Sequence, residues 1–431
     1  MSAPAALAPA PGRRAPLAWA LYDWGNSAFA TTVMAALFPL FFHKYWCAGA
    51  APGVASLRLG AASSTASAIV LVLAPLIGAL ADAGRLRKAL LVAFALLGVV
   101  ATAALYLVPA GAWWLAAALY VAGTVGFLGA NVPYDGLLVS VARPEARDRV
   151  SSLGYGLGYL GGGLLFALDV AMVLRPDAFG LPDRTAATRV AFLSVALWWA
   201  GFTLPLLAWV PEPPSGGALR GAVGRALREL GGAVRALRAL PTAARFLLAY
   251  WLYIDAVQTI IVMATSFGSE LGLPDSALIV ALLVTQFVGF PAAILFGRLG
   301  ERLGTRTSLL IAIGVYLGVV GMSAAMTATL FYVLAAVVGL VQGAAQALSR
   351  SLYSRLIPAR KAGEMFGFYN MLGKFAAVVG PLLVGITSAS VGPRWSVASL
   401  AVLLVAGGAL LWRVDEARGR GEAARLDGAE A

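Results

Sequence analysis

Long apolar stretches of this sequence carry acidic and amide side chains at helical spacings. Asp23, Asn26 and Ser27 are three and four residues apart, so they lie on one face of a helix. An Asp at the centre of a bilayer costs about 2.5–3.5 kcal/mol on insertion scales, so it is expected to face a cavity. This pattern predicts a path for a proton or a polar solute.

Similar polar faces recur in four further apolar stretches. They contain, in chain order, Asn131 and Asp135; Asp255, Gln258 and Thr259; Gln342, Gln346 and Arg350; Asn370 and Lys374. The residues nearest the middle of their stretches are Asp255, Gln258, Gln342 and Lys374. Asp23, Asp135 and Arg350 lie nearer one end, where ion pairs would hold the mouth of a path closed. For Asp23, a role in such a gate and a role in binding both stay open.

The elements that position these residues are membrane helices. Hydrophobic residues make up 60% of the 431 residues, charged residues 12%, and the mean hydropathy is +0.84. Apolar runs of about 20 residues are long enough to cross a bilayer as helices. The predicted spans are 17–42, 60–82, 89–109, 113–142, 150–174, 189–210, 244–267, 277–297, 308–327, 330–353, 364–389 and 395–413. We therefore expect an all-α membrane protein with twelve transmembrane helices.

The break between the sixth and seventh spans divides the chain into two six-helix bundles, 17–210 and 244–413. Residues 1–16 are predicted to be a disordered tail, and 414–431 a second tail. The linker 211–243 is basic; its arginines are three to seven residues apart. A membrane-surface amphipathic helix and a solvated linker both fit that pattern.

The distribution of basic residues predicts the orientation. With the amino terminus inside, few Lys and Arg of the chain's 32 fall on the outer side: Lys44, Arg58, Arg175, Arg184, Arg189 and Arg394. The positive-inside rule then places both termini in the cytoplasm. Six tryptophans at span ends are expected to form aromatic belts: Trp46, Trp113, Trp114, Trp209, Trp395 and Trp412.

Other classes of function lack sequence support. The net charge of +12 is spread over short loops, with no nucleic-acid-binding motif. Cys47 and His43 are the only Cys and His, so no metal cluster, internal disulfide or cofactor is expected. Walker, nucleophile-elbow and zinc-protease motifs are missing, so the chain is not expected to be an enzyme.

The two halves repeat short motifs. Gly78–Lys88 follows the second span, and the related stretch Gly297–Arg306 follows the eighth. The latter resembles the major facilitator loop signature, whereas the former lacks one residue before Gly84. Three further stretches resemble one subfamily of that superfamily: Tyr22–Thr31, Gln346–Ser351 and Phe366–Lys374. Together they resemble the bacterial "unknown major facilitator" transporters, which are related to the fungal vacuolar amino-acid effluxers of autophagy.

The resemblance implies the major facilitator fold, two six-helix bundles around a central cavity lined by helices 1, 4, 7 and 10. The polar faces then give the candidate substrate or proton pathway: Asp23, Asn26, Asp255, Gln258, Gln342, Gln346, Asn370 and Lys374. The candidate cytoplasmic gate comprises Asp82, Arg85, Asp135, Glu301, Arg302, Arg306 and Arg350. By resemblance, Asp82 and Glu301 are expected to dock on arginines or helix amino termini of the opposite bundle.

The favoured function is a secondary transporter that moves a small, amino-acid-like solute by alternating access, coupled to protons. Asp255 is the preferred proton carrier. Asp23 is the alternative, because Asp23, Asn26 and Ser27 in the first half correspond to Asp255, Gln258 and Thr259 in the second. Lys374 is expected to recognise a carboxylate, and a permanent Lys374–Asp pair that only braces its helix is the structural alternative. Two alternatives stay open: an exporter of apolar or cationic compounds, and a non-transporting membrane receptor. We expect a functional monomer in a bacterial inner membrane, with lipid, solute and protons as its partners.

Overall fold

The computed structural model describes residues 14–51, 54–83, 86–212, 237–270, 275–325, 327–391 and 397–429. Within these ranges, side chains that are not described include those of 262–270, 275–277 and 374–382. Residues 1–13, Arg85 and most of the predicted linker therefore lie outside the described residues, as does the Lys374 side chain.

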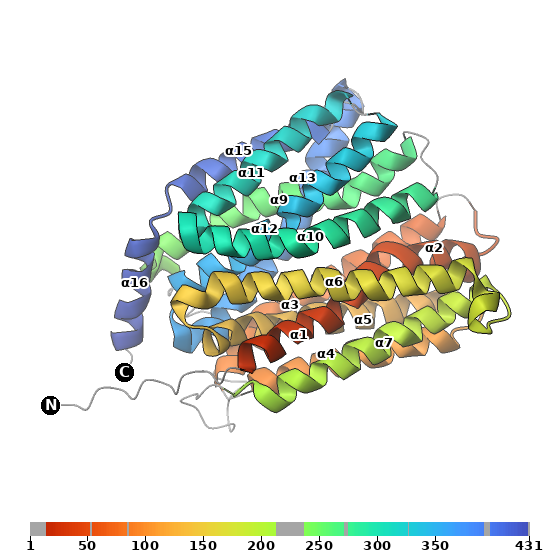
Figure 1. Cartoon of the computed structure of the whole chain (residues 1–431), viewed down its shortest axis with the longest axis horizontal. Coiled ribbons are helices and arrows are strands. Elements are labelled where there is room, and N and C mark those ends of the chain that lie inside the picture. The colour runs from red at the N-terminus through yellow and green to blue at the C-terminus, as the bar shows by residue number, and fades with distance from the viewer. Residues whose placement is uncertain are drawn as a thin grey trace.

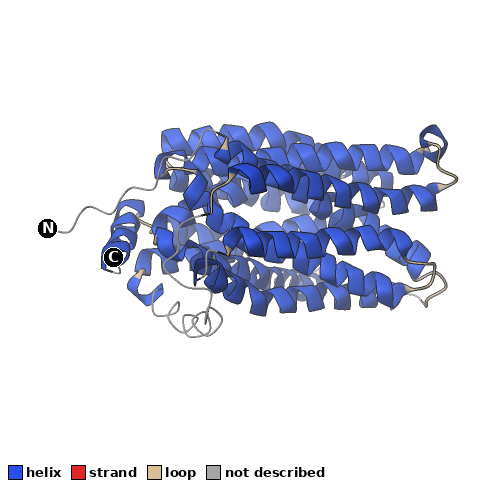
Figure 2. Ribbon diagram, turned by 90° about the horizontal axis from the view of Figure 1, so that it is seen from below, coloured by secondary structure: helices blue, strands red, loops and turns tan. Residues whose placement is uncertain are grey.

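The described secondary structure is helical throughout, and the long helices lie side by side along one axis (Figure 1, Figure 2). The first span consists of α1 (Ala15–Ala28), the π-helical segment Phe29–Leu37, α2 (Phe38–Phe41) and a second π-helical segment, Phe42–Trp46. The other helices of the first half are α3 (Val54–Ala83), α4 (Arg87–Ala104), α5 (Trp113–Val141), α6 (Arg147–Leu174) and α7 (Arg184–Trp209). The start of α1 and the whole of α16 lie at the left end of the molecule in Figure 1, here called the termini end.

The second half contains α9 (Pro241–Glu270), α10 (Asp275–Leu303), α11 (Thr305–Met322), α12 (Ala328–Leu356), α13 (Ala362–Val391), α15 (Ala401–Trp412) and α16 (Glu416–Ala429). Ten helices within the described residues are long and apolar enough to cross a membrane. α13 and α15, the latter preceded by the short turn Val397–Leu400, occupy the positions of the other two predicted spans, 364–389 and 395–413. The predicted fold class is confirmed.

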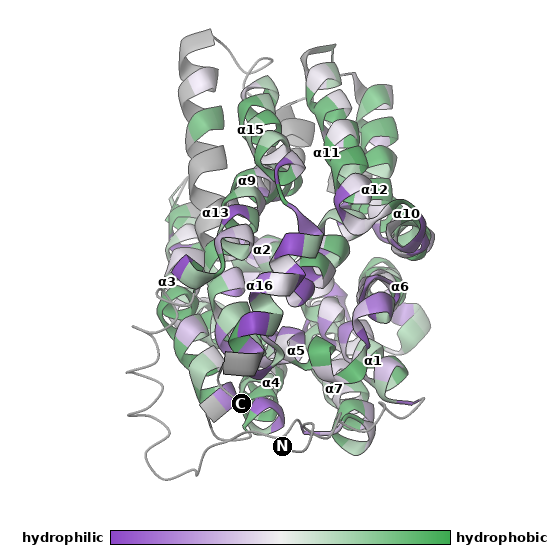
Figure 3. Cartoon of the chain, turned by 90° about the vertical axis from the view of Figure 1, so that its left-hand side faces the viewer, coloured by the Kyte–Doolittle hydropathy of each residue, from purple (hydrophilic) through white to green (hydrophobic). Residues whose placement is uncertain are grey.

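Each half has its own hydrophobic core. One large cluster of buried side chains lies between Ala15 and Val210, and another between Leu240 and Val414. Seen from the termini end, hydrophilic residues gather around α16 and the helix ends, whereas the outer helices are mainly hydrophobic (Figure 3). Most buried apolar side chains thus pack within their own half, and a few cross between the halves: Val139 packs against the second core, and Met371 packs against a smaller cluster of α3 and α5.

Glycines bring the two bundles into close contact. α3 packs on α13, where a Cβ on Gly78 would collide with the Gly363 carbonyl oxygen. α6 packs on α10, where a Cβ on Gly156 would lie 3.3 Å from the Phe290 carbonyl oxygen. Within the first bundle, Gly158, Gly161 and Gly162 of α6 face α1 at similarly close range.

Three details differ from the sequence prediction. The first helix runs on to Trp46 rather than ending at 42, and π-helical turns widen it. Trp46 is fully buried among Phe38, Phe41 and Phe192, so it belongs to the core and not to an aromatic belt. The predicted tail after 413 contains α16, whose acids bind the ends of other helices and so fold it onto the bundle.

Candidate functional site

A buried arginine of the second bundle is bound by three helices of the first. Arg350 lies on α12 six residues before its end, and it is 2% exposed. Its Nη1 donates to Asp135 Oδ1 of α5 at 3.1 Å, and its Nη2 lies 3.5 Å from Asp23 Oδ2 of α1. Its Nε donates to Ser151 Oγ of α6 at 2.9 Å. We call Arg350, Asp23, Asp135 and Ser151 the Arg350 cluster.

Aromatic rings of the first bundle enclose the guanidinium group. Its central carbon lies 4.6 Å from the centre of the Trp19 ring, 4.4 Å from that of Tyr155 and 5.4 Å from that of Tyr134. A cation over a ring face is attracted by the ring quadrupole, by about 2 kcal/mol or more when it is desolvated. The rings therefore stabilise the charge and exclude water around it.

The two carboxylates receive further hydrogen bonds. Tyr134 donates its hydroxyl to Asp23 Oδ2 at 2.7 Å, and Asn370 of α13 donates to Asp135 Oδ2 at 2.9 Å. Two acids thus share one arginine, so the cluster carries a charge of −1 when both acids are ionised. Removing one partner of a buried ion pair costs about 3–5 kcal/mol, because the other charge is left uncompensated.

A second polar layer lies closer to the termini end. Arg355, near the end of α12, donates its Nη2 to Asp148 Oδ1 of α6 at 3.0 Å, and its Nε lies 2.9 Å from Glu416 Oε1 of α16. Asp148 Oδ2 also accepts from Thr305 Oγ1, at the start of α11, at 2.7 Å. Arg147 donates from α6 to the Ser354 carbonyl oxygen at 2.6 Å. These contacts join α6 of the first bundle to the second bundle.

Asp82 forms a third connection between the bundles. At the end of α3, it accepts hydrogen bonds from the backbone N–H groups of Gly363 at 3.0 Å and Glu364 at 2.8 Å. These belong to the first turn of α13, whose amino terminus carries the positive end of the helix dipole. Asp82 Oδ1 also lies 2.6 Å from Nη2 of Arg87. Asp82 thus docks on a helix amino terminus of the opposite bundle.

The remaining gate candidates sit near the surface or within one bundle. Glu301 is partly exposed, and its Oε1 lies 4.0 Å from Nε of Arg149 in the first bundle. Arg302 is exposed. Arg306 donates to the carbonyl oxygens of Trp412 and Val414, both in its own bundle.

The pathway candidates lie at different levels. Asn26 donates to Asn131 Oδ1 at 3.0 Å, which connects α1 to α5 within the first bundle. Asp255 is 1% exposed on α9. The other described candidates, Gln258, Gln342 and Gln346, are half-buried. Among the described residues, no three His, Cys, Asp or Glu side chains group together to hold a metal ion.

Several residues that join helices at the termini end were not predicted from the sequence. Four of these residues flank the predicted spans: Arg87, Arg147, Asp148 and Arg355. Charged residues at such positions are usually exposed in loops. The exposures of these four residues, 4%, 7%, 2% and 6%, show that they are buried between helices. Opposite charge at helix ends could have indicated one of these contacts, because Arg355 lies in the last turn of α12 and Asp148 in the first turn of α6.

Comparison with known proteins decides the family. The family described as "Vacuole effluxer Atg22 like" matches residues 53–424. The chain belongs to this family. An uncharacterized MFS-type transporter of Bacillus subtilis, YxiO, is 39% identical over 92% of this chain and 94% of its own length. Autophagy-related protein 22-1 of Penicillium rubens is 25% identical over 65% of this chain and 51% of its own length.

Solved structures support the fold of this Atg22-like chain. The proton:xylose symporter XylE superposes with a TM-score of 0.72, covering 94% of this chain and 96% of its own, at 15% identity. The human organic anion transporter MFSD10 superposes with a TM-score of 0.70, covering 93% and 99%, at 16% identity. The chain therefore has the major facilitator fold of secondary transporters, and its relatives are transporters rather than enzymes.

Proposed function

We propose that this chain is a proton-coupled transporter of an amino-acid-like solute that works by alternating access. We further propose a bacterial inner membrane as its location, with the termini end in the cytoplasm. The observation that carries the proposal is the Arg350 cluster, in which a cation of one bundle is held by two acids of the other. Such a contact closes one mouth of a central path, and it can form and break as the bundles rock.

The polar contacts between the bundles at the termini end support a reversible gate. Asp82, Asp148 and the Arg350 cluster join the bundles through ion pairs and hydrogen bonds, whereas each bundle keeps a separate apolar core. Polar contacts can be exchanged for water when the mouth opens. Breaking them leaves both cores intact, which a rigid-body rocking motion requires.

The acids supply two candidate proton carriers. Asp255 is buried on α9, near the middle of its span, where an acid is expected to serve a transport path. Asp23 is its counterpart in the repeat and shares Arg350 with Asp135. Protonation of either acid in the cluster would leave one carboxylate for one arginine. We propose Asp255 as the carrier and Asp23 as a gate acid that responds to protonation.

Asp255→Asn tests the coupling. In proteoliposomes the variant should lose proton-driven accumulation of solute but retain exchange of solute across the membrane. Uphill transport at the wild-type rate by this variant would reject Asp255 as the carrier. The native solute can first be found by thermal-shift screening of amino acids, peptides, sugars and lipids, because a ligand at 100 times its Kd stabilises the folded state by about 2.7 kcal/mol.

Lys374 on α13 is the proposed recognition site for the carboxylate of the solute. The sequence places an ammonium group well inside a membrane span, where a charge without compensation is expensive. Lys374→Ala should weaken binding of the native solute much more than binding of its carboxyl-amidated analogue. Equal losses for both would leave Lys374 a bracing role only.

A further inference from the structure

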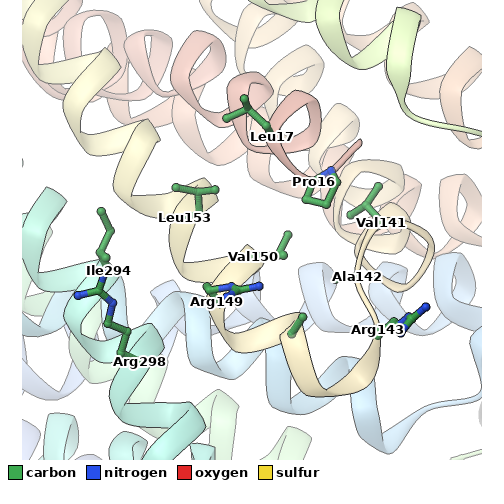
Figure 4. Close-up of a pocket in the computed structure, with 11 residues that line it drawn as sticks. Pro16, Leu17, Val141, Ala142, Arg143, Arg149, Val150, Leu153, Ile294 and Arg298 are labelled. Carbon is green, nitrogen blue, oxygen red and sulfur yellow. The ribbon is translucent and has the colours of Figure 1, made fainter. Parts of the chain in front are cut away.

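A pocket opens at the termini end where the two bundles meet. It lies between the start of α1, the loop joining α5 to α6, and α10, and its volume is about 560 Å³. Its apolar lining includes Leu17, Leu153 and Ile294. Its polar lining includes Arg143, Arg149 and Arg298, which come from that loop, α6 and α10 (Figure 4).

The pocket is strongly basic. Three of its eleven lining residues are arginines, and none of the eleven is acidic. All three arginines are exposed, and the Arg149 side chain is 68% exposed. Glu301 lies beside the pocket, with its Oε1 4.0 Å from Nε of Arg149 at the surface. The arginines are therefore available to a ligand, and the charge of that ligand must be negative.

The surroundings identify the kind of anion. The two helices that meet beside the pocket present exposed apolar side chains further along their length: Leu164 and Leu168 on α6, Phe287 and Leu295 on α10. Exposed leucines on membrane helices face the acyl chains of lipids. By the predicted spans 150–174 and 277–297, the pocket arginines Arg149 and Arg298 lie one residue outside the apolar core of the bilayer. A ligand with an anionic head and long apolar tails fits both parts.

We propose that this pocket binds an anionic phospholipid, whose charged headgroup lies among Arg143, Arg149 and Arg298 at the rim of the pocket. The acyl chains then follow Leu153, Ile294 and the exposed apolar face of α6 and α10 towards the middle of the bilayer. Clusters of arginine beside membrane helices favour anionic lipid headgroups in this way.

Binding at this pocket is coupled to the conformation of the transporter. Both bundles line it, and their helices are in direct contact beside it: a Cβ on Gly297 of α10 would lie 2.6 Å from Ser152 Cβ of α6. When the termini-side mouth opens, Arg298 moves away from Arg143 and Arg149, and the site is divided. An anionic lipid that binds the undivided site more tightly than the divided one therefore stabilises the state closed at the termini end, by the difference between its two binding free energies.

Lipid binding is measured on the purified full chain in detergent, by native mass spectrometry and by thermal unfolding. The probes are phosphatidylglycerol, phosphatidylcholine with the same acyl chains, and inorganic phosphate. Phosphatidylglycerol should be retained and should raise the unfolding temperature, whereas the other two probes should have little effect. Each of Arg149→Gln and Arg298→Gln should weaken phosphatidylglycerol binding about five-fold, as expected for one surface arginine facing an anionic lipid.

Arg413→Gln is the matched control. Arg413 is exposed directly after the last span, and it does not line the pocket. Equal losses for Arg413→Gln and Arg298→Gln would overturn the proposal, since general surface charge would then explain the binding. Equal retention of the two lipids would also overturn it. A full effect of inorganic phosphate would replace the lipid with a soluble anion.

Discussion

Arg350 and Asp135 are 215 residues apart in the sequence, yet their side chains meet at 3.1 Å between the two bundles. Arg350 makes its other described polar contacts with Asp23 and Ser151, which also belong to the first bundle. The arginine is therefore compensated only while the bundles are closed at this end. The contacts of the Arg350 cluster therefore change the free-energy difference between the states closed and open at the termini end. They also contribute to the stability of the protein.

Replacing the cation should open the termini end. Arg350→Gln leaves Asp23 and Asp135 buried without their arginine, which costs the closed state about 3–5 kcal/mol. Spin labels on Glu145 and Arg360, exposed positions of opposite bundles, should move apart in the variant. Arg245→Gln is the control, because Arg245 is exposed and donates to the Arg413 carbonyl oxygen within its own bundle. Unchanged distances in Arg350→Gln would show that the cluster does not hold the gate.

The paired loop acids should differ in effect. Asp82→Asn replaces one acceptor of the two α13 N–H groups with an amide donor and removes the charge beside Arg87. A loss of about 1–2 kcal/mol is expected, which lowers the closed population relative to the open one by a factor of about 5–30. Glu301→Gln should lower the closed population far less, because exposed ion pairs such as Glu301–Arg149 contribute about 0–1 kcal/mol. The same spin-label pair measures both, and equal shifts would contradict this ranking.

Close backbone contact between α3 and α13 should tolerate no added methyl group. Gly78→Ala forces its Cβ against the Gly363 carbonyl oxygen, and we expect a cost of about 1–3 kcal/mol to the closed state. Gly314→Ala on α11 is the control, because no atom lies within 4 Å of its Cβ and alanine favours a helix by up to about 1 kcal/mol. Crosslinking yield between cysteines on α3 and α13, measured without Cys47, should fall only in Gly78→Ala. A yield equal to that of the parent would show that the helices adjust.

The carboxylate of Glu422 should stabilise the start of α9. It accepts from the Thr242 backbone N–H at 3.0 Å and from the Thr242 hydroxyl at 3.1 Å. Glu422→Ala removes a helix cap, for a loss of about 0.5–2 kcal/mol in thermal unfolding. Arg418→Ala removes only the exposed partner of Glu422, so its loss should be smaller. A larger loss for Arg418→Ala would place the stabilisation in the surface pair.

The proposed orientation is testable by labelling. Single cysteines between 211 and 243, in a chain without Cys47, should resist an impermeant maleimide in intact cells and react after lysis. A cysteine at Arg184, at the opposite end, should react in intact cells. Ready labelling of 211–243 from outside would reverse the orientation.

The sequence predicts the spans because hydropathy is a local property. The predicted starts and ends differ from the helices by a few residues; 113–142 against Trp113–Val141 is one example. The polar faces depend equally on local sequence, and their helical spacing predicts Asp23, Asp135, Arg350 and Asn370 as site residues. The structure then joins these four through hydrogen bonds across the bundles.

The second polar layer and α16 depend on tertiary contacts that periodicity does not encode. Asp148 and Arg355 lie outside or at the edge of the predicted spans, so only their packing reveals that they are buried. The sequence 416–429 is hydrophilic, and its helix is held by Glu416, Glu422 and Asp427 at the ends of α12, α9 and the turn before α13. Hydrogen bonds between residues so far apart in the sequence can be identified only from the three-dimensional structure.

The glycines of α6 limit how this helix can vary. Gly158, Gly161 and Gly162 face α1, while Gly156 and Gly163 face α10, and an added Cβ at each of these positions would lie within 3.3 Å of another atom. Two opposed sides of one helix thus accept no larger residue without moving a neighbour. Leu164 and Leu168 of the same helix are exposed, so a change of apolar side chain at these positions displaces no buried neighbour.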